Sequence, residues 1–184
     1  MTSSDGSFGT LRSPAAWARL VLTALIGLAL DQWSKRYSFK LAQENRFDAD
    51  GDIWKAIPGF LHIHVTTNRG AVFGIGQGWR SAFVLVSLAA IIFVLYLFAS
   101  SGRQRLYQIV LGMLIAGILG NLYDRLALGY VRDMIWALPK WGVFPWIFNV
   151  ADSLLCVGVT VMIVYSFFHS PPKPKPADAE PSST

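Results

Sequence analysis

The chain has 184 residues, of which 53% are hydrophobic, and its mean hydropathy is +0.43. The length predicts a single domain, and the gathering of apolar residues into long blocks predicts a membrane protein. The formal net charge of +5 does not indicate nucleic-acid binding, because the basic residues are scattered and form no recognition motif. A weak affinity for anionic lipid headgroups is the better interpretation. Cys156 is the only cysteine, so an intramolecular disulfide is excluded.

Four apolar segments follow one another along the chain, at residues 15–34, 81–100, 106–123 and 147–168. Each comes close to the roughly 20 helical residues that span a hydrocarbon core, and helices satisfy their own backbone hydrogen bonds there. The first segment runs into polar residues without a small-residue cleavage site, so we expect a retained anchor and not a signal peptide. The pattern predicts an all-α membrane protein with four transmembrane helices.

The segments between the spans are uneven. We expect a membrane domain over residues 15–169, a disordered tail over 1–14 and a Pro-rich disordered tail over 170–184. The long connection over 35–80 contains, within 57–67, an alternating stretch at 60–65 that predicts a strand or a pair of strands. The connection over 124–146 carries three Trp residues of the kind found in interfacial aromatic belts. An even number of spans places both termini on one side, and the charge distribution leans towards the cytoplasm.

Two carboxylates stand out because a membrane chain bears a high cost for them. Asp152 is the only charged residue of the last apolar run, and Asp133 lies in the connection just before it. An ionised group at a helix centre costs roughly 2.5–3.5 kcal/mol on insertion scales, so such residues are functional candidates. Two carboxylates that share one proton can act as base and acid. This is the chemistry of an aspartic protease.

Further polar residues occur at matching depth. Asn121, Asp124 and Arg125 are spaced i, i+3, i+4, which places them on one face of a continuing helix. Asn149 and Asp152 are again spaced i, i+3, and Asp152 lies five residues, or roughly 7–8 Å of helix rise, into its run. Both aspartates are therefore expected just under one membrane face. Small residues at 112, 116, 117 and 120 predict close packing of the third span.

Other interpretations remain. Asp124 beside Arg125, and Asp133 beside Arg132, could be ordinary interfacial ion pairs. His62 and His64 share one face of the predicted strand, but without a third ligand they favour packing over a metal site. No H-E-x-x-H or G-x-S-x-G motif occurs.

A proton-coupled transporter subunit is the alternative function. Membrane carboxylates can relay protons, but a transporter favours carboxylates at the midplane and repeated or broken helices. In this chain the acids crowd one face, and no repeat is evident.

Four blocks of the sequence resemble the motifs of the lipoprotein signal peptidase (signal peptidase II) family, in the family's order. Residues 31–35 (DQWSK) resemble D-Q-x-[ST]-K, and residues 68–73 (NRGAVF) resemble N-x-G-A-[AV]-F. Residues 120–133 resemble G-N-L-x-D-R-x-x-x-G-x-V-x-D, and residues 148–153 (FNVADS) resemble F-N-x-A-D-S. The resemblance covers roughly residues 15–168.

The resemblance implies a membrane-embedded aspartic endopeptidase that cuts prolipoproteins just before a cysteine already carrying diacylglycerol, without a metal or cofactor. It implies a monomer of the bacterial inner membrane with cytoplasmic termini and its site near the outer face. A small extracytoplasmic sheet would lie in 35–80 and a mobile periplasmic lid in 134–146. The implied residues are a catalytic dyad of Asp133 and Asp152, site-shaping Asn68, Asn121, Arg125 and Asn149, and supporting carboxylates Asp31 and Asp124.

Three residues depart from the family pattern. Met134 stands where Phe is usual, Trp136 replaces a more polar stretch, and Arg69 adds a positive charge to the Asn68 motif. These departures bear on substrate preference more than on the reaction.

Overall fold

The computed structural model describes residues 9–44, 47, 53–70, 76–142 and 146–168. Within them lie four long helices, α1 (Pro14–Gln43), α2 (Arg80–Ala99), α3 (Arg105–Ala127) and α4 (Val150–Phe168). Each is long and apolar enough to cross a membrane. The expected fold class, a helical membrane protein with four spans and a small β element, is therefore confirmed.

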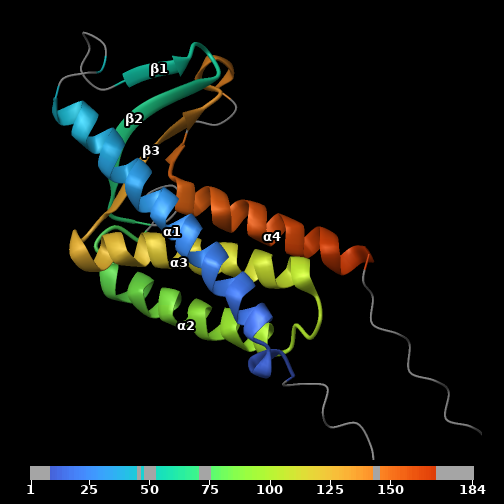
Figure 1. Ribbon diagram of the computed structural model, residues 1–184. Coiled ribbons are helices and arrows are strands. Elements are labelled where there is room, and N and C mark those ends of the chain that lie inside the picture. The colour runs from blue at the N-terminus through green and yellow to red at the C-terminus, as the bar shows by residue number, and fades with distance from the viewer. Residues whose placement is uncertain (1–8, 45–46, 48–52, 71–75, 143–145, 169–184) are drawn as a thin grey trace, which may run out of the picture.

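Helix α3 lies at the centre of the bundle, between α2 and α4 and beneath α1 (Figure 1). Its small residues make this possible. A Cβ on Gly112 would lie 2.7 Å from the Leu20 carbonyl oxygen of α1, and one on Gly117 would lie 2.6 Å from the Ala151 oxygen of α4. The small-residue face of α3 thus lets two neighbouring backbones approach closely, as the sequence predicts.

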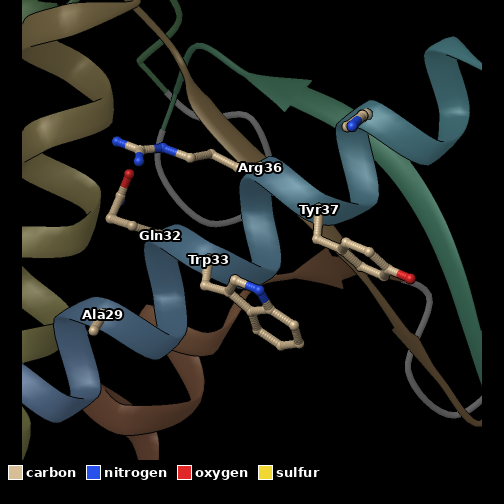
Figure 2. Close-up of a pocket in the computed structure, with 6 residues that line it drawn as sticks. Ala29, Gln32, Trp33, Arg36 and Tyr37 are labelled. Carbon is tan, nitrogen blue, oxygen red and sulfur yellow. The ribbon is translucent and has the colours of Figure 1, made fainter.

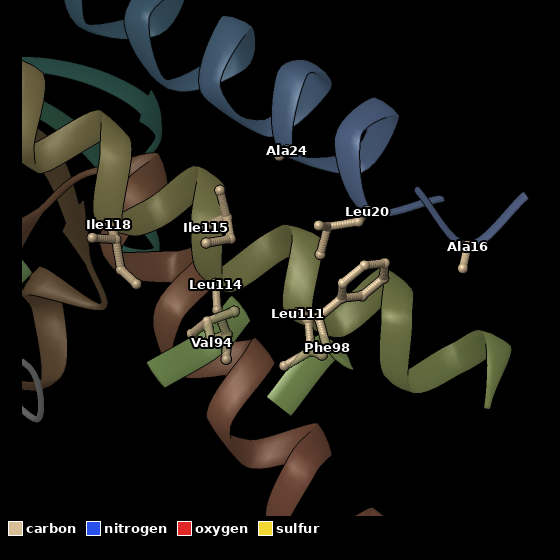
Figure 3. Packing of buried hydrophobic residues seen from close by; sticks show 9 residues of the cluster. All are labelled: Ala16, Leu20, Ala24, Val94, Phe98, Leu111, Leu114, Ile115 and Ile118. Atoms are coloured by element: carbon tan, nitrogen blue, oxygen red, sulfur yellow. The ribbon is translucent and has the colours of Figure 1, made fainter. Parts of the chain in front are cut away.

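One apolar cluster holds α1, α2 and α3 together (Figure 3). Its buried members are Ala16, Leu20, Ala24, Val94, Phe98, Leu111, Leu114, Ile115 and Ile118. The outer faces are apolar as well. Ile92 of α2 is 69% exposed and Phe167 of α4 is 77% exposed. Large apolar side chains on the outside of the bundle suit a lipid environment.

A four-stranded antiparallel sheet lies at the end of the bundle where α3 ends and α4 begins (Figure 1). Its order is β1 (Ile53–Ile57), β2 (Leu61–Asn68), β3 (Val131–Ala137) and β4 (Ile147–Phe148). The strand predicted at 60–65 is present as β2, which begins one residue later, at Leu61, and runs further, to Asn68. The sheet draws on both long connections, because β2 pairs with β3 with Thr66 opposite Asp133.

Some boundaries differ from the expected ones. Helix α1 continues past Ser34 to Gln43, and α4 begins at Val150 because Ile147 and Phe148 pair with β3. We expected a lid over residues 134–146, but residues 134–137 are part of the sheet. They belong to a strand paired on both sides, and Met134 is 1% exposed. A short helix, η3 (Pro139–Trp141), follows β3.

The expected disorder of the N-terminal tail is not met at residues 9–12. They form the short helix η1 (Gly9–Arg12), in which Thr10 is buried and its hydroxyl donates to the Gly102 carbonyl at 3.3 Å. The expectations for residues 1–8, 143–145 and 169–184 lie outside the described residues, as do residues 71–73 of the Asn68 motif.

Substitution of Gly117 tests the close contact between α3 and α4. A Cβ there would meet the Ala151 oxygen and Leu155 Cγ, each at 2.6 Å, and the backbone atom cannot move aside cheaply. We expect Gly117→Ala to lower stability by about 1–3 kcal/mol, measured as thermal unfolding in detergent. Gly9→Ala is the matched control, since nothing lies within 4 Å of that added Cβ. Equal unfolding temperatures for the two variants would contradict the packing described.

Candidate active site

Four buried charged residues join three elements near the sheet. Lys35 of α1 places its Nζ 2.8 Å from Asp31 Oδ2 and 3.3 Å from Asp124 Oδ2 of α3. Arg132 of β3 reaches the other oxygen of Asp124, with 2.6 Å between Nη2 and Oδ1. The side chains of Asp31, Lys35 and Asp124 are all 0% exposed. We call these four residues the buried ion cluster.

The buried ion cluster fixes the strand that carries Asp133. Asp124 accepts from the Arg132 backbone N–H at 3.0 Å as well as from its guanidinium, so the start of β3 is held against the end of α3. Gln32 adds to this contact by accepting from Arg132 Nη2 at 2.8 Å. The two carboxylates and two cations balance in charge. Removal of one partner from such a buried set costs about 3–5 kcal/mol.

A capping box at the start of α4 fixes the second carboxylate. The Asn149 Oδ1 accepts from the Asp152 backbone N–H at 2.9 Å, and Asp152 Oδ2 accepts from the Asn149 N–H at 3.2 Å. This reciprocal pair satisfies two backbone donors that a helix start leaves open. The i, i+3 spacing seen in the sequence is therefore a helix cap that also orients Asp152.

The side chain of Asn149 connects both aspartates. While its Oδ1 caps α4, its Nδ2 donates to Asp133 Oδ1 at 2.6 Å. The residue is fully buried. Asn121 of α3 donates to the remaining Asp152 oxygen, Oδ1, at 2.8 Å. Asp133 and Asp152 thus come from different elements and are held by a shared set of amides.

The environment of Asp133 favours its protonated form. Burial, followed by the nearby charge of Asp152, raises the pKa of Asp133 to about 7. Hydrogen bonds from Asn149 and Asn68 and the charge of Lys35 act in the opposite direction on this pKa but do not cancel the rise. Near neutral pH the side chain therefore carries a proton for part of the time, as one member of a proton-sharing pair must.

Arg125 and Asn68 complete the surroundings. The Arg125 guanidinium interacts electrostatically with Asp152 and Asp133, and its Nη2 lies 3.4 Å from the Gly70 carbonyl oxygen. It also lies over the Phe83 ring, at 5.0 Å from the centroid. Asn68, at the end of β2, hydrogen-bonds Asp133 and accepts from the Gly70 N–H at 2.9 Å.

The structure thus brings together the eight residues singled out from the sequence. The ion pairs between chain neighbours, which were the alternative interpretation of these residues, are not the pairs that the structure shows. Arg132 pairs with Asp124 and not with its neighbour Asp133. Arg125 contacts the Asn121 and Gly70 carbonyls. Three residues of the site were not assigned a role from the sequence, namely Gln32, Lys35 and Arg132. The signal for Lys35 was its i, i+4 spacing from Asp31 at the end of an apolar run.

His62 and His64 pack against Trp136. The ring centroids of His62 and His64 lie 5.7 and 5.9 Å from that of Trp136. These contacts agree with the packing role that the sequence favoured for the two histidines. It also gives Trp136, one of the departures from the family pattern, a place on the face of β3 away from Asp133.

A surface groove lies apart from the paired carboxylates. A groove of about 450 Å³ runs along the outside of α1, lined by Ala29, Gln32, Trp33, Arg36, Tyr37 and Lys40 (Figure 2). Trp33 and Tyr37 stack within it, with ring centroids 5.5 Å apart. Such aromatic and basic side chains at a span end are typical of the membrane interface. The groove does not contain the paired carboxylates and is not the candidate reaction centre.

Comparisons with known proteins agree with this geometry. The family model described as "Signal peptidase (SPase) II" matches residues 23–168. A lipoprotein signal peptidase of Coxiella burnetii is 35% identical, over 90% of this chain and 99% of that protein. One of Lactobacillus gasseri is 37% identical, over 82% of this chain and 92% of that protein.

Solved structures are similar as well. A bacterial membrane enzyme, solved by the in meso method at 2.3 Å, is 31% identical with a TM-score of 0.73, over 86% of this chain and 93% of that one. A second, solved at 1.9 Å, is 32% identical with a TM-score of 0.68, over 79% of this chain and 90% of that one. The chain therefore belongs to the signal peptidase II family of membrane peptidases.

Proposed function

We propose that this chain is an aspartic endopeptidase that removes signal peptides from diacylglyceryl-modified prolipoproteins, cutting just before the lipidated cysteine. The observation that carries the proposal is the Asn149 side chain, which binds Asp133 with its amide and caps Asp152 with its oxygen. Two carboxylates from different elements are thereby held as one unit. The substrate class follows from the family, whose members include proteins named lipoprotein signal peptidase.

The proposed reaction uses the pair with one proton between them. The ionised carboxylate takes a proton from a water molecule, and the protonated carboxyl donates a hydrogen bond to the scissile carbonyl oxygen. Attack by the water, with transfer of that carboxyl's proton to the carbonyl oxygen, gives a tetrahedral diol. The carboxyl that took the water's proton then passes it to the leaving amine, the other carboxylate takes a proton back from one hydroxyl of the diol, and the peptide bond breaks. The pair ends with one proton, as it began.

The surrounding groups have positioning and electrostatic roles in this proposal. Asn149 and Asn121 hold the two carboxylates, and Asn68 supports Asp133. Arg125 supplies a positive charge near a pair that carries a single negative charge. Asp31 and Asp124 are supporting carboxylates that act through Lys35 and Arg132.

An apolar row beside Asp133 suits a signal peptide. Ile63, Ile135 and Phe148 are opposite one another across β2, β3 and β4. Because Ile135 is two residues from Asp133 on one strand, its side chain shares the face of Asp133. We infer that apolar residues near the cleavage point contact this row.

The position of the pair at one end of the bundle supports a site at the membrane surface. Asp152 is in the first turn of α4 and Asp133 is in the sheet beyond the spans. In the bacterial inner membrane, we place this end at the outer face and both termini in the cytoplasm. The chain would act as a monomer, with membrane lipids around it.

The transporter alternative is not favoured. The family assignment is to a peptidase, and the buried carboxylates Asp31, Asp124 and Asp133 gather at one end of the bundle and not along its middle. A proton path would need titratable groups that continue through the spans.

Neutral replacement of either aspartate tests the dyad. Asp133→Asn and Asp152→Asn should each lower cleavage of a diacylglyceryl-modified prolipoprotein by at least about 100-fold, because each removes the shared acid–base function. The assay would use purified protein in lipid, with a chelator present throughout. Glu44→Gln is the control, since Glu44 is an exposed carboxylate paired with Lys40 at the end of α1. Full cleavage by a folded Asp133→Asn or Asp152→Asn variant would show that these two residues are not the catalytic dyad.

The rate should depend on pH in a definite direction. The active pair holds one proton, and the raised pKa of Asp133, about 7, places the loss of that proton near neutrality. We therefore expect kcat to fall as pH rises through this region, and to fall again in acid when both carboxyls are protonated. A kcat profile measured in detergent across this range checks it. A rate that stays level from about pH 5 to pH 9 would contradict a proton-sharing pair.

A further inference from the structure

Lys35 is a fully buried cation whose three contacts are all acceptors. Its Nζ lies 2.8 Å from Asp31 Oδ2, 3.3 Å from Asp124 Oδ2 and 3.1 Å from Asn121 Oδ1. An ammonium group has three N–H donors and no acceptor capacity. Each donor thus has one partner, and the third partner has to be an oxygen. The contacts with Asp31 and Asp124 balance the charge of Lys35. The contact with Asn121, which is a neutral amide, adds nothing to that charge balance.

The contact with Asn121 determines which way its amide points. The Asn121 Oδ1 accepts from Lys35 and also from Asn149 Nδ2 at 3.2 Å, so the Nδ2 is directed to Asp152 Oδ1 at 2.8 Å. A flipped amide would place its NH₂ against two donors and its oxygen against a carboxylate. Buried unsatisfied groups of this kind are costly. The ammonium therefore permits one orientation of Asn121.

We propose that Lys35 is a positioning residue of the peptidase reaction, which acts through Asn121 to hold Asp152 in its reactive orientation. The proposal rests on the proposed function, because it assumes that Asp152 reacts. It gives Lys35 a role beyond pairing with Asp31 and Asp124. The path has two hydrogen bonds, from Lys35 to Asn121 and from Asn121 to Asp152.

The charge of Lys35 has a second effect on the pair. The groups that face the pair are Lys35 of α1, Asn68 of β2, Asn121 and Arg125 of α3, and Asn149 just before α4. Asp31, Asp124 and Arg132 balance the charge behind them. The positive charge of Lys35 opposes the rise in the pKa of Asp133. Loss of that charge should move the acidic limb of the rate profile to higher pH, because the pair then releases its first proton less readily.

Two double variants separate the hydrogen bond from the charge. Asp31→Asn with Lys35→Met removes one charge of each sign, so Asp124 and Arg132 remain as a balanced pair. Asp31→Asn with Lys35→Gln has the same charge but keeps an N–H donor for Asn121, on a side chain one bond shorter. The two variants have the same charge, and they differ in that Gln offers an amide, with N–H donors and a carbonyl acceptor, where Met offers a thioether.

The test is the kcat and KM of both variants over a range of pH, on a diacylglyceryl-modified prolipoprotein, with unfolding temperatures measured alongside. We expect the Met variant to lose about 10- to 100-fold in kcat with little change in KM, since Asp152 loses its orientation. The Gln variant should recover most of that kcat. In both, the acidic limb should move to higher pH, but by less than loss of the Lys35 charge alone would give, because the removed negative charge of Asp31 offsets part of the lost positive charge.

Equal kcat in the two variants, with the wild-type pH profile, would overturn the proposal. So would activities that simply follow the unfolding temperatures, or the absence of a cooperative unfolding transition in both variants, since Lys35 would then be structural only. Wild type and Asp152→Asn are measured in parallel. Failure of the wild type to cleave, or cleavage by Asp152→Asn, would instead count against the proposed function itself.

Discussion

The buried ammonium of Lys35 between Asp31 and Asp124 is the interaction on which the polar end of the molecule depends. It joins α1 to α3, and Arg132 extends the same charge balance into the sheet. Charges at membrane depth persist only when they are paired or face water. Here the pairing is complete, and each partner comes from an element that carries or supports a residue of the candidate site. The cluster holds the start of β3 against the end of α3, in addition to the pairing of β3 with β2 and β4.

The site obtains its precision from ordinary helix and sheet features. The capping box of α4 would satisfy the open backbone donors of any helix start. In this chain the capping hydrogen bonds also fix the orientation of the Asp152 carboxylate, and the amide of the capping residue, Asn149, donates to Asp133. In the same way, the glycines of α3 that allow close packing bring Gly120 beside Asp31, where an added Cβ would lie 2.5 Å from the carboxylate. Stability and the geometry of the reaction centre therefore share the same atoms.

Local patterns in the sequence predicted the spans, the strand at 60–65 and the residues around the carboxylates. These depend on apolar run length and on spacing within one element. The sequence could not show that residues 131–137 form a strand between β2 and β4, because that pairing joins segments far apart in the chain. Nor could it show α1 reaching Gln43, since its polar end is held by tertiary contact, with Ser38 buried.

The structure does not show the ion pairs that chain neighbours could have formed, Asp124 with Arg125 and Asp133 with Arg132, and the reason is geometric. Arg132 and Asp133 are successive residues of a strand, so their side chains point to opposite faces and cannot pair. Asp124 and Arg125 are successive residues of a helix and do not face each other either. Arg132 meets Asp124 across eight residues of chain only because a turn brings β3 back against α3. Alternation within the strand, once the strand is known, would have placed Arg132 with the cluster and Asp133 with the site.

The proposed reaction requires that Asp133 and Asp152 hold one proton between them. The most direct measurement is the infrared absorption of protonated carboxyl groups in the protein in lipid, at about pH 6, below the Asp133 pKa of about 7. We predict a protonated carboxyl band in the wild type that titrates away at lower pH in Asp152→Asn, because burial still raises the pKa of Asp133 in that variant but the charge of Asp152 no longer does. A band that titrates at the same pH in Asp152→Asn, or that is absent from the wild type, would contradict a shared proton.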